Sequence, residues 1–483
     1  MSRRRLALRP FLPRPSWAAL LLLWLVAGPA GSAGPAAGAA GEGYGLLAGL
    51  TSAVAGERRD AARRLVESGD ASLVPGLVDA YFFMPRNQRA EALSALAALT
   101  GEKAGERYHD WVELLGRRPD LVARPGYLAW KARLLARVDP RYPSLLYADA
   151  PVRIRAEEVV WGGVPVEGIP ALDQPAHVPA AQAGYLTGDE RVFGVSLGGE
   201  TRAYPRRIVD WHEVVNDVVG GEPVTLAYSS LCGAAVLYAT RAAPGEAYTF
   251  GTSGLLYRAN KLMLDRQTRS LWSQLTGEPV IGRLAGPARQ GEAPARLAVL
   301  PLTLTTWQDW RHRHPETTVL ALDRELERRS GFQYLPGAAE RKRAGVAFPT
   351  GPAGPQSAAL PPRTEVYAVR LGGRAKAYPL ARALAERVID DRVGGEPVVV
   401  VADPGSGAVR AYRRGERTFK RGLKADELVD GEGRRWTAGE DALLPQEAGA
   451  TLAPLPRLPG HPSFWSGWYA FFPDTALYGS PPR

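Results

Sequence analysis

Apolar residues recur at helical spacing over the first part of the chain. In GERRDAARRLVESGD the apolar positions fall on one side of a helix, and SLVPGLVDAYFF and NQRAEALSALAALTG repeat the pattern. Ser72 can cap the second of these helices, and Pro75 suits its first turn. The pattern therefore predicts that residues 45–145 form a small all-α region of HEAT-like helical pairs. Such a region could bind a partner or serve as a packing support for the rest of the chain.

The pattern changes after Tyr147 to short apolar runs that alternate with polar residues and are broken by glycine and proline. RVFGVSLGGETRAYP predicts a hairpin that turns at Gly198 and Gly199. Pro205 suits the start of a helix, which we expect to run to about Asp217. GEPVTLAYSSLCGAAVLY then predicts a strand, a turn at SSLCG and a second strand. We assign residues 150–330 to a first β-rich lobe.

Part of this lobe recurs further along the chain. The segment from Val192 to Tyr238 aligns without a gap with the segment from Val366 to Tyr412, and both copies contain LGG, AYP and VGGEPV. The tryptophans of TTWQDWRHRHPETTVL recur in SFWSGWYAFFPDTALY. We interpret the repeat as an internal duplication and assign residues 364–479 to a second lobe.

The predicted fold is therefore α+β. Two tandem, duplicated β-rich lobes with a pseudo-two-fold relationship follow a small HEAT-like cap. Residues 331–363 are rich in glycine, proline and alanine and show no periodicity, so we expect a connector draped over the surface.

The two copies differ at the residue types that carry chemistry. Three positions of the first lobe face a different residue in the second: His212 aligns with Glu386, Asn216 with Asp390, and Cys232 with Ser406. The shared residues are mostly glycine, proline and apolar types. We therefore expect a site in the first lobe alone, the second lobe being degenerate.

Residues 1–39 have the features of an export signal. A basic start is followed by a short apolar run from Trp17 to Ala27 and a tract of small residues, with cleavage expected after Ala33 or Ala39. A run this short does not span a bilayer. We expect a secreted or extracytoplasmic protein, or one held at the membrane by an uncleaved leader. Because leader arginines carry much of the net charge of +10, no nucleic-acid partner is expected.

Cys232 is the single cysteine of the chain, so it has no intramolecular disulfide partner. A thiol in an oxidising compartment needs a reason such as burial, a bound metal or reactivity. We expect it at the SSLCG turn, with His212 on the inner face of the preceding helix and Asn216 at the edge of that face. Polar residues that could line a ligand site here are Arg202, Arg258, Asn260, Asp265 and Gln274.

Several strings in order, among them EGIPALDQP, FGVSLGGETRAYP, WHEVVNDVVGGEPV, YSSLCGAA and SGLLYRANKLMLDRQTRSLWSQLTGE, resemble the family of domain of unknown function 3179 (DUF3179). The resemblance covers about Arg153 to Tyr478 and implies no established activity. It implies a C-x-x-C at the turn, whose first cysteine is Ser229 in this chain. A dithiol redox cycle or a two-thiolate metal clamp would need both sulfurs.

Three classes of function stay open at this point. The first is an exported protein that binds an unknown small ligand or protein partner, or a purely structural module. The second is a site for a copper-like metal with Cys232, His212 and Met263 as ligands. The third is an enzyme with Cys232 as nucleophile, His212 as base and Asn216 or Asp217 as orienting group. HExxH, Walker, dinucleotide and nucleophile-elbow motifs are absent from the sequence.

Overall fold

The computed structural model describes residues 40–243, 246–288, 294–335, 337–338, 357–446 and 452–480. The expected export leader, residues 1–39, lies outside these ranges, and so does residue 336 and the stretch 339–356 of the expected connector. From Ala40 onward the chain forms one compact unit. Over the described ranges, every helix is too short or too polar to cross a membrane.

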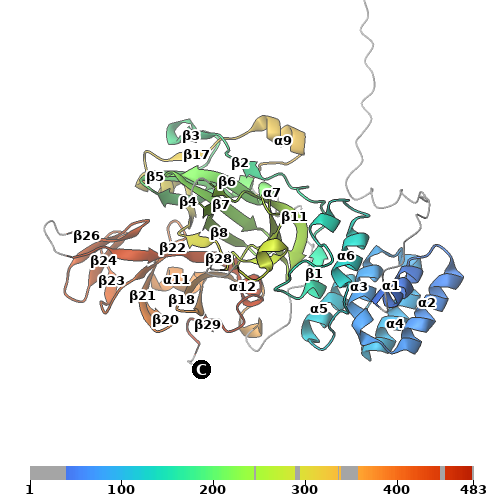
Figure 1. Cartoon of the computed structure of the whole chain (residues 1–483). Helices are drawn as coiled ribbons and strands as arrows, with labels where there is room; N and C mark the ends of the chain where they lie inside the picture. Colours follow the sequence, from blue (N-terminus) through green and yellow to red (C-terminus); the bar gives the residue numbers. More distant parts are fainter. Residues whose placement is uncertain are drawn as a thin grey trace, which may run out of the picture. The chain divides into compact units, whose positions relative to one another are not determined.

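The N-terminal part is helical, as predicted (Figure 1). Its helices are α1 (Ala40–Leu50), α2 (Ala55–Ser68), α3 (Val74–Phe83), α4 (Ala90–Thr100), α5 (Tyr108–Arg117) and α6 (Tyr127–Leu135). Their apolar faces share one core, in which Leu65, Leu77 and Trp111 are buried. In this core the Lys131 ammonium of α6 lies 3.0 Å from the Asp79 carboxylate of α3. The ion pair compensates the cost of burying either charge alone.

The first β-rich half contains three five-stranded sheets, which are drawn in teal to yellow in Figure 1. One runs in the order β1 (Val159–Trp161), β11 (Phe250–Tyr257), β12 (Asn260–Asp265), β13 (Leu271–Ser273), β14 (Pro279–Ile281). The second runs β15 (Ala298–Leu300), β8 (Ala234–Ala239), β7 (Glu222–Ser229), β6 (Val214–Val219), β2 (Leu172–Asp173). The third runs β16 (Thr303–Thr306), β4 (Arg191–Leu197), β5 (Glu200–Pro205), β17 (Thr318–Leu320), β3 (His177–Pro179). A short pair, β9 (Arg241–Ala243) and β10 (Glu246–Ala247), follows β8.

The second half contains a four-stranded and an eight-stranded sheet, drawn in orange and red in Figure 1. The smaller runs β28 (Gly460–Phe464), β18 (Glu365–Leu371), β19 (Arg374–Pro379), β29 (Ala476–Leu477). The larger runs β20 (Val388–Val393), β21 (Glu396–Asp403), β22 (Ala408–Arg413), β27 (Leu455–Leu458), β26 (Ala442–Pro445), β25 (Arg435–Ala438), β24 (Glu427–Asp430), β23 (Phe419–Arg421). The Phe419 amide of β23 donates to Asp390 Oδ2 of β20 at 2.8 Å, so the sheet curls into a near-barrel.

Short helices connect these strands: α7 (Arg206–His212), α8 (Trp307–Arg313), α9 (Arg324–Ser330), α11 (Leu380–Glu386) and α12 (Trp465–Tyr469). The hairpin of β4 and β5 turns at Gly198 and Gly199. Gly198 has φ +58°, and a Cβ there would lie 2.7 Å from the Gly220 carbonyl oxygen, so both backbone and space favour glycine.

The helix after Pro205 is shorter than the sequence predicts. It ends at His212, Glu213 takes a left-handed conformation with φ +61°, and the chain continues as strand β6. Asn216 and Asp217 therefore lie on a strand, so the prediction that they share a helix with His212 is wrong. The valine-rich run that starts at Val214 favours a strand, because β-branched side chains lose rotamer freedom in a helix.

The beginning of the expected connector also differs from the prediction. Phe332 stacks on Trp211 with ring centroids 4.8 Å apart, and Trp211 Nε1 donates to the Gln333 carbonyl at 2.7 Å. Tyr334 is 3% exposed and belongs to the core of the first half. This segment is thus packed into the protein because its aromatic rings bury large apolar areas; it is not draped over the surface.

The two halves contact each other directly. The Phe464 amide at the end of β28 donates to the Cys232 carbonyl at 2.6 Å. From the other side, Arg191 Nη1 of β4 donates to the Ser406 carbonyl at 2.8 Å. The turns after β7 and β21 therefore lie at the boundary between the halves.

Candidate functional site

Cys232 lies in the turn between β7 and β8, as predicted, and is 1% exposed. Its Sγ donates to the Ala259 carbonyl at 3.1 Å. Burial raises the pKa of the thiol to about 11, although the neighbouring Asn260 and Ser229 side chains and the charge of Lys261 act in the opposite direction. At neutral pH the sulfur is therefore a protonated thiol, which is a poor nucleophile and a poor metal ligand.

The second half seals the Cys232 turn. Ser463 Oγ, like the Phe464 amide, is hydrogen-bonded to the Cys232 carbonyl, at 3.3 Å. Gly467 of α12 approaches so closely that a Cβ at this position would lie 2.6 Å from Cys232 Cβ. The turn is thus a packed element of the boundary between the halves.

The imidazole of His212 is buried and both of its nitrogens are engaged. Nδ1 lies 2.7 Å from the Pro170 carbonyl oxygen, and Nε2 is hydrogen-bonded to the Tyr334 hydroxyl. A carbonyl can only accept, so Nδ1 carries the proton and Nε2 accepts from Tyr334. Burial lowers the pKa of His212, which keeps the ring neutral.

These contacts bear directly on the predicted thiol and imidazole pair. The thiol donates to Ala259, whereas the imidazole is hydrogen-bonded to Pro170 and Tyr334. The two groups thus have different hydrogen-bond partners, whereas activation of Cys232 by His212 as a base needs a direct hydrogen bond between them. Local sequence spacing could not show this, because Tyr334 is remote in sequence from His212.

Asn216 and Asp217 make structural contacts, and the imidazole that Asp217 meets is that of His177, whose Nε2 lies 3.4 Å from Asp217 Oδ2. The Asn216 amide donates to the Phe250 carbonyl at 2.8 Å and accepts from the Phe250 amide at 3.0 Å, which joins β6 to β11. Asp217 accepts from Tyr204 Oη at 2.6 Å and lies 2.7 Å from Arg202 Nη1. The carboxylate and the guanidinium neutralise each other.

Of the other predicted ligand-binding residues, Asn260 and Gln274 lie beside the Cys232 turn, whereas Arg258 and Asp265 have other partners. Arg258 pairs with Glu158, its Nε 2.9 Å from Oε2, and also donates to the Ala470 carbonyl at 2.8 Å. Asp265 caps the turn after β12 and accepts from Trp272 Nε1 at 2.7 Å. Gln274 Nε2 donates to the Ala227 and Ala234 carbonyls at 3.0 and 2.9 Å, which braces the Cys232 turn. Asn260 is fully buried beside the thiol.

Met263 is fully buried in the apolar cluster that also contains Cys232 and Trp272. Over the described part of the chain, His, Cys, Asp and Glu side chains do not gather in groups of three or more that could hold a metal ion. The metal site of Cys232, His212 and Met263 stays a prediction: Cys232 and Met263 share this cluster, whereas both ring nitrogens of His212 are hydrogen-bonded to Pro170 and Tyr334.

Lys261 is a buried residue that the sequence reasoning missed. Its Nζ lies 2.9 Å from Glu213 Oε2 and donates to the Glu213 carbonyl at 3.0 Å and to the Tyr228 carbonyl. The ammonium holds the left-handed Glu213 and the end of β7 in place. A lysine inside the apolar strand NKLML was the available signal.

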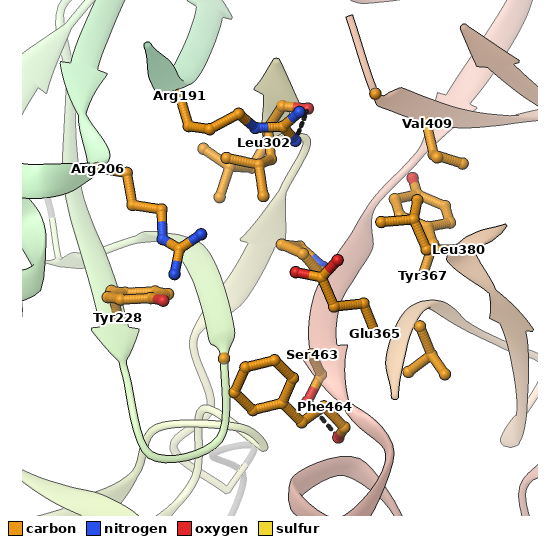
Figure 2. A pocket seen from close by; sticks show the side chains of 15 residues that line it. Arg191, Arg206, Tyr228, Leu302, Glu365, Tyr367, Leu380, Val409, Ser463 and Phe464 are labelled. Carbon is orange, nitrogen blue, oxygen red and sulfur yellow. Dashed lines mark hydrogen bonds between the residues drawn. The ribbon is translucent and has the colours of Figure 1, made fainter. Parts of the chain in front are cut away.

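A small cleft lies between the two halves (Figure 2). The space at its centre measures about 40 Å³, which is room for roughly three water molecules. The first half contributes Arg191, Arg206, Tyr228, Gly233, Leu302 and Leu304, and the second half contributes Glu365, Val366, Tyr367, Leu380, Gly407, Val409, Pro462, Ser463 and Phe464. Figure 2 shows both guanidinium groups and the Glu365 carboxylate directed toward the space between the halves.

The charges of this cleft are unevenly distributed. Burial lowers the pKa of Arg191, the charge of Glu365 opposes this shift, and the charge of Arg206 adds to it. Both arginines are half-buried, whereas Glu365 is exposed. The first half thus presents two positive charges to the cleft, and the second half presents one negative charge and an apolar surface.

A larger hollow of about 690 Å³ lies on the second half alone, beside β19, β20 and β29. Two of its cations are paired with carboxylates: Lys376 lies 2.7 Å from Asp391, and Arg392 lies 3.2 Å from Glu416. The smaller cleft is the stronger candidate for a specific site, because two half-buried arginines and a carboxylate meet there between mostly apolar walls.

Helices at the N-terminal end, followed by two β-rich halves with a small polar cleft between them, define an α+β protein. A family model described as a protein of unknown function (DUF3179) matches residues 166–475. The chain belongs to this family, as its motifs indicate. Among curated proteins and among solved structures, nothing matches the chain.

Proposed function

We propose that this protein is an exported binding protein that holds a small ligand in the cleft between its two halves. The observation that carries the proposal is the convergence of Arg191 and Arg206 from one half with Glu365 from the other (Figure 2). Charged groups placed in a half-buried, mostly apolar hollow are typical of ligand sites, because they fix the orientation of the ligand.

The alternatives have weaker support. The thiol is sealed and its pKa is raised to about 11, and the imidazole is hydrogen-bonded elsewhere. A copper-like site or a cysteine nucleophile would require both groups to move out of well-packed positions. A binding role needs no such movement.

We further propose that the two halves arose by duplication and are related by a pseudo-two-fold axis. Support comes from matching element bounds: β4, β5, α7, β6, β7 and β8 begin where the gapless alignment places the starts of β18, β19, α11, β20, β21 and β22. The parallel pairing of β5 with β17 also has a counterpart in that of β19 with β29.

The proposed duplication makes the position of the cleft informative. Aligned pairs face each other across it: Arg191 with Glu365, Arg206 with Leu380, and Gly233 with Gly407. The glycines are the same in both copies, whereas the charged positions differ. A site at the axis could thus have gained its polarity by divergence of the two copies.

The position of the protein outside the cytoplasm and the role of the helical region are also proposals. The leader sequence supports export. The helical region contacts the β-rich part through Lys131, which donates to the Ala156 carbonyl at 3.1 Å, and through the Ala123 amide, which donates to Glu157 Oε1 at 3.1 Å. These contacts favour HEAT-like helices as a packing support.

Thermal-shift screening of the purified protein against a library of small polar metabolites tests the binding proposal. Leu380→Trp fills the cleft, and Leu444→Trp, at a position 46% exposed, is the matched control. We expect compounds that stabilise the wild type and the control but not Leu380→Trp. If no compound in the library behaves in this way, the proposal is wrong.

A further inference from the structure

Building on the proposed binding function, we infer that the cleft recognises a small dipolar molecule that carries an anionic and a cationic group, as an amino acid does. The anionic group would face Arg191 and Arg206, and the cationic group would face Glu365. The inference rests on the opposite signs of the two walls.

The arginine side of the cleft is preorganised for an anion. Arg191 donates to the Ser406 carbonyl at 2.8 Å and to the Leu304 carbonyl at 3.4 Å, and both acceptors are neutral. These contacts fix the guanidinium without cancelling its charge. A guanidinium has five N–H donors, so it can bind a carboxylate in addition to two carbonyls.

Arg206, also on the first half, adds a second positive charge beside that of Arg191. Its guanidinium lies over the Tyr228 ring, 5.8 Å from the ring centroid, and its Nε lies 3.8 Å from Asp210. The charge of Arg206 lowers the pKa of Arg191, which means that the two like charges repel across the cleft. An anion placed between two such cations relieves this repulsion.

Glu365 gives the opposite wall a negative charge. It begins strand β18, and its carboxylate points into the space toward the arginines (Figure 2). A ligand that carries only an anionic group would be repelled by Glu365. A ligand that carries only a cationic group would be repelled by the two arginines. Only a molecule with both charges complements both walls.

The rest of the lining limits the ligand body. Leu302, Leu304, Leu380, Val409 and Phe464 are apolar, and the central space is about 40 Å³. A compact head group with a small apolar substituent at the open side of the cleft would fit this surface. Larger polar ligands would leave buried hydrogen-bonding groups unpaired against the leucines.

Isothermal titration calorimetry with matched probes tests the inference. Glycine and L-leucine carry both charges, 4-methylpentanoate carries only the anion, and 3-methylbutylamine carries only the cation. We expect L-leucine to bind the full-length protein at least about 10-fold more tightly than either singly charged probe, the change that one charged hydrogen bond produces.

The variant Glu365→Gln tests whether Glu365 binds the cationic group of the ligand. We expect it to reduce the preference for L-leucine over 4-methylpentanoate about 10-fold, whereas Glu416→Gln, on an 82% exposed side chain, leaves the preference unchanged. Equal binding of L-leucine and 4-methylpentanoate, or an unchanged preference in Glu365→Gln, overturns the dipolar inference and leaves the binding proposal intact. Lack of binding by all four probes also overturns the inference, whereas the binding proposal is judged by the library screen and Leu380→Trp.

Discussion

Glu440→Gln removes the negative charge that two buried arginines share at the boundary between the halves. Arg410 Nη2 lies 2.6 Å from Glu440 Oε1, Arg457 Nη1 is paired with Oε2, and all three side chains are at most 4% exposed. Thr303 of the first half also donates to Glu440 Oε2, at 2.6 Å. Although burial raises the pKa of Glu440, the charges of Arg410 and Arg457 prevail and hold it well below its usual range.

The expected loss of stability follows from this burial. Breaking a buried ion pair by removing one partner costs about 3–5 kcal/mol, because the remaining charge stays desolvated and uncompensated. Here two guanidinium groups lose their carboxylate. Arg457 also donates to the Leu302 carbonyl at 3.0 Å, so the disturbance reaches β16 of the first half. We therefore expect Glu440→Gln to destabilise the fold by about 4 kcal/mol.

Urea unfolding followed by tryptophan fluorescence measures this loss. The matched control is Glu416→Gln, which removes a carboxylate from an exposed pair with Arg392 and should change the free energy of unfolding by less than about 0.5 kcal/mol. Hydrogen exchange should show reduced protection in β16, β22 and β27, the strands that carry Thr303, Arg410 and Arg457. A loss below about 1 kcal/mol, or one equal to that of the control, would refute the argument that this charge network joins the halves.

Three further predictions concern other buried groups. Burial, assisted by the charge of Arg370, lowers the pKa of His461 to about 4. An unfolded histidine titrates near 6.5, so between pH 6.5 and 4 the unfolded chain takes up a proton that the folded chain does not. The free energy of unfolding should therefore fall by up to about 3 kcal/mol as the pH decreases through this window. Urea unfolding at several pH values should show a weaker dependence of this free energy on pH in His461→Gln than in the wild type. Burial raises the pKa of the Cys232 thiol to about 11, so at neutral pH Cys232 should react with a disulfide reagent roughly 100-fold more slowly in the folded than in the unfolded protein; a faster rate that depends on His212 would contradict its placement. Gly467→Ala should destabilise the protein by about 1–3 kcal/mol, because the added Cβ would lie 2.6 Å from Cys232 Cβ. Gly56→Ala is the control and should not destabilise the protein, because no atom lies within 4 Å of a Cβ added there. Equal thermal stability of the two variants would disprove the close contact.

The elements that depend on local pattern agree with the sequence. Helical periodicity and Pro75 located α3, and alternation around the Gly198 turn located β4 and β5. The end of α7 was missed because Pro205 signals where a helix begins, whereas its end depends on the left-handed Glu213. That conformation is held by Lys261, whose ammonium reaches Glu213 from another strand.

The candidate site was predictable only in part. The turn at Cys232 follows from its small and polar residues. Burial was one of three explanations that the sequence left open for a lone thiol, and the thiol is buried. The partners of the buried groups were out of reach, because Tyr334 contacts His212 from a segment that appeared to be a connector. The cleft was also missed, since Arg191 and Glu365 are far apart in the sequence and come from different halves of the β-rich part.

The sequence alone determined the family, the helical and β-rich regions, and a few local elements such as α3 and the hairpin at Gly198, because these depend on residue types only a few positions apart. The tertiary structure decided which chemical groups meet. It placed the thiol and the imidazole in separate hydrogen-bond environments and brought Arg191, Arg206 and Glu365 to one cleft. Such contacts depend on how the halves pack, and packing is set by the shape and burial of many residues far apart in the chain.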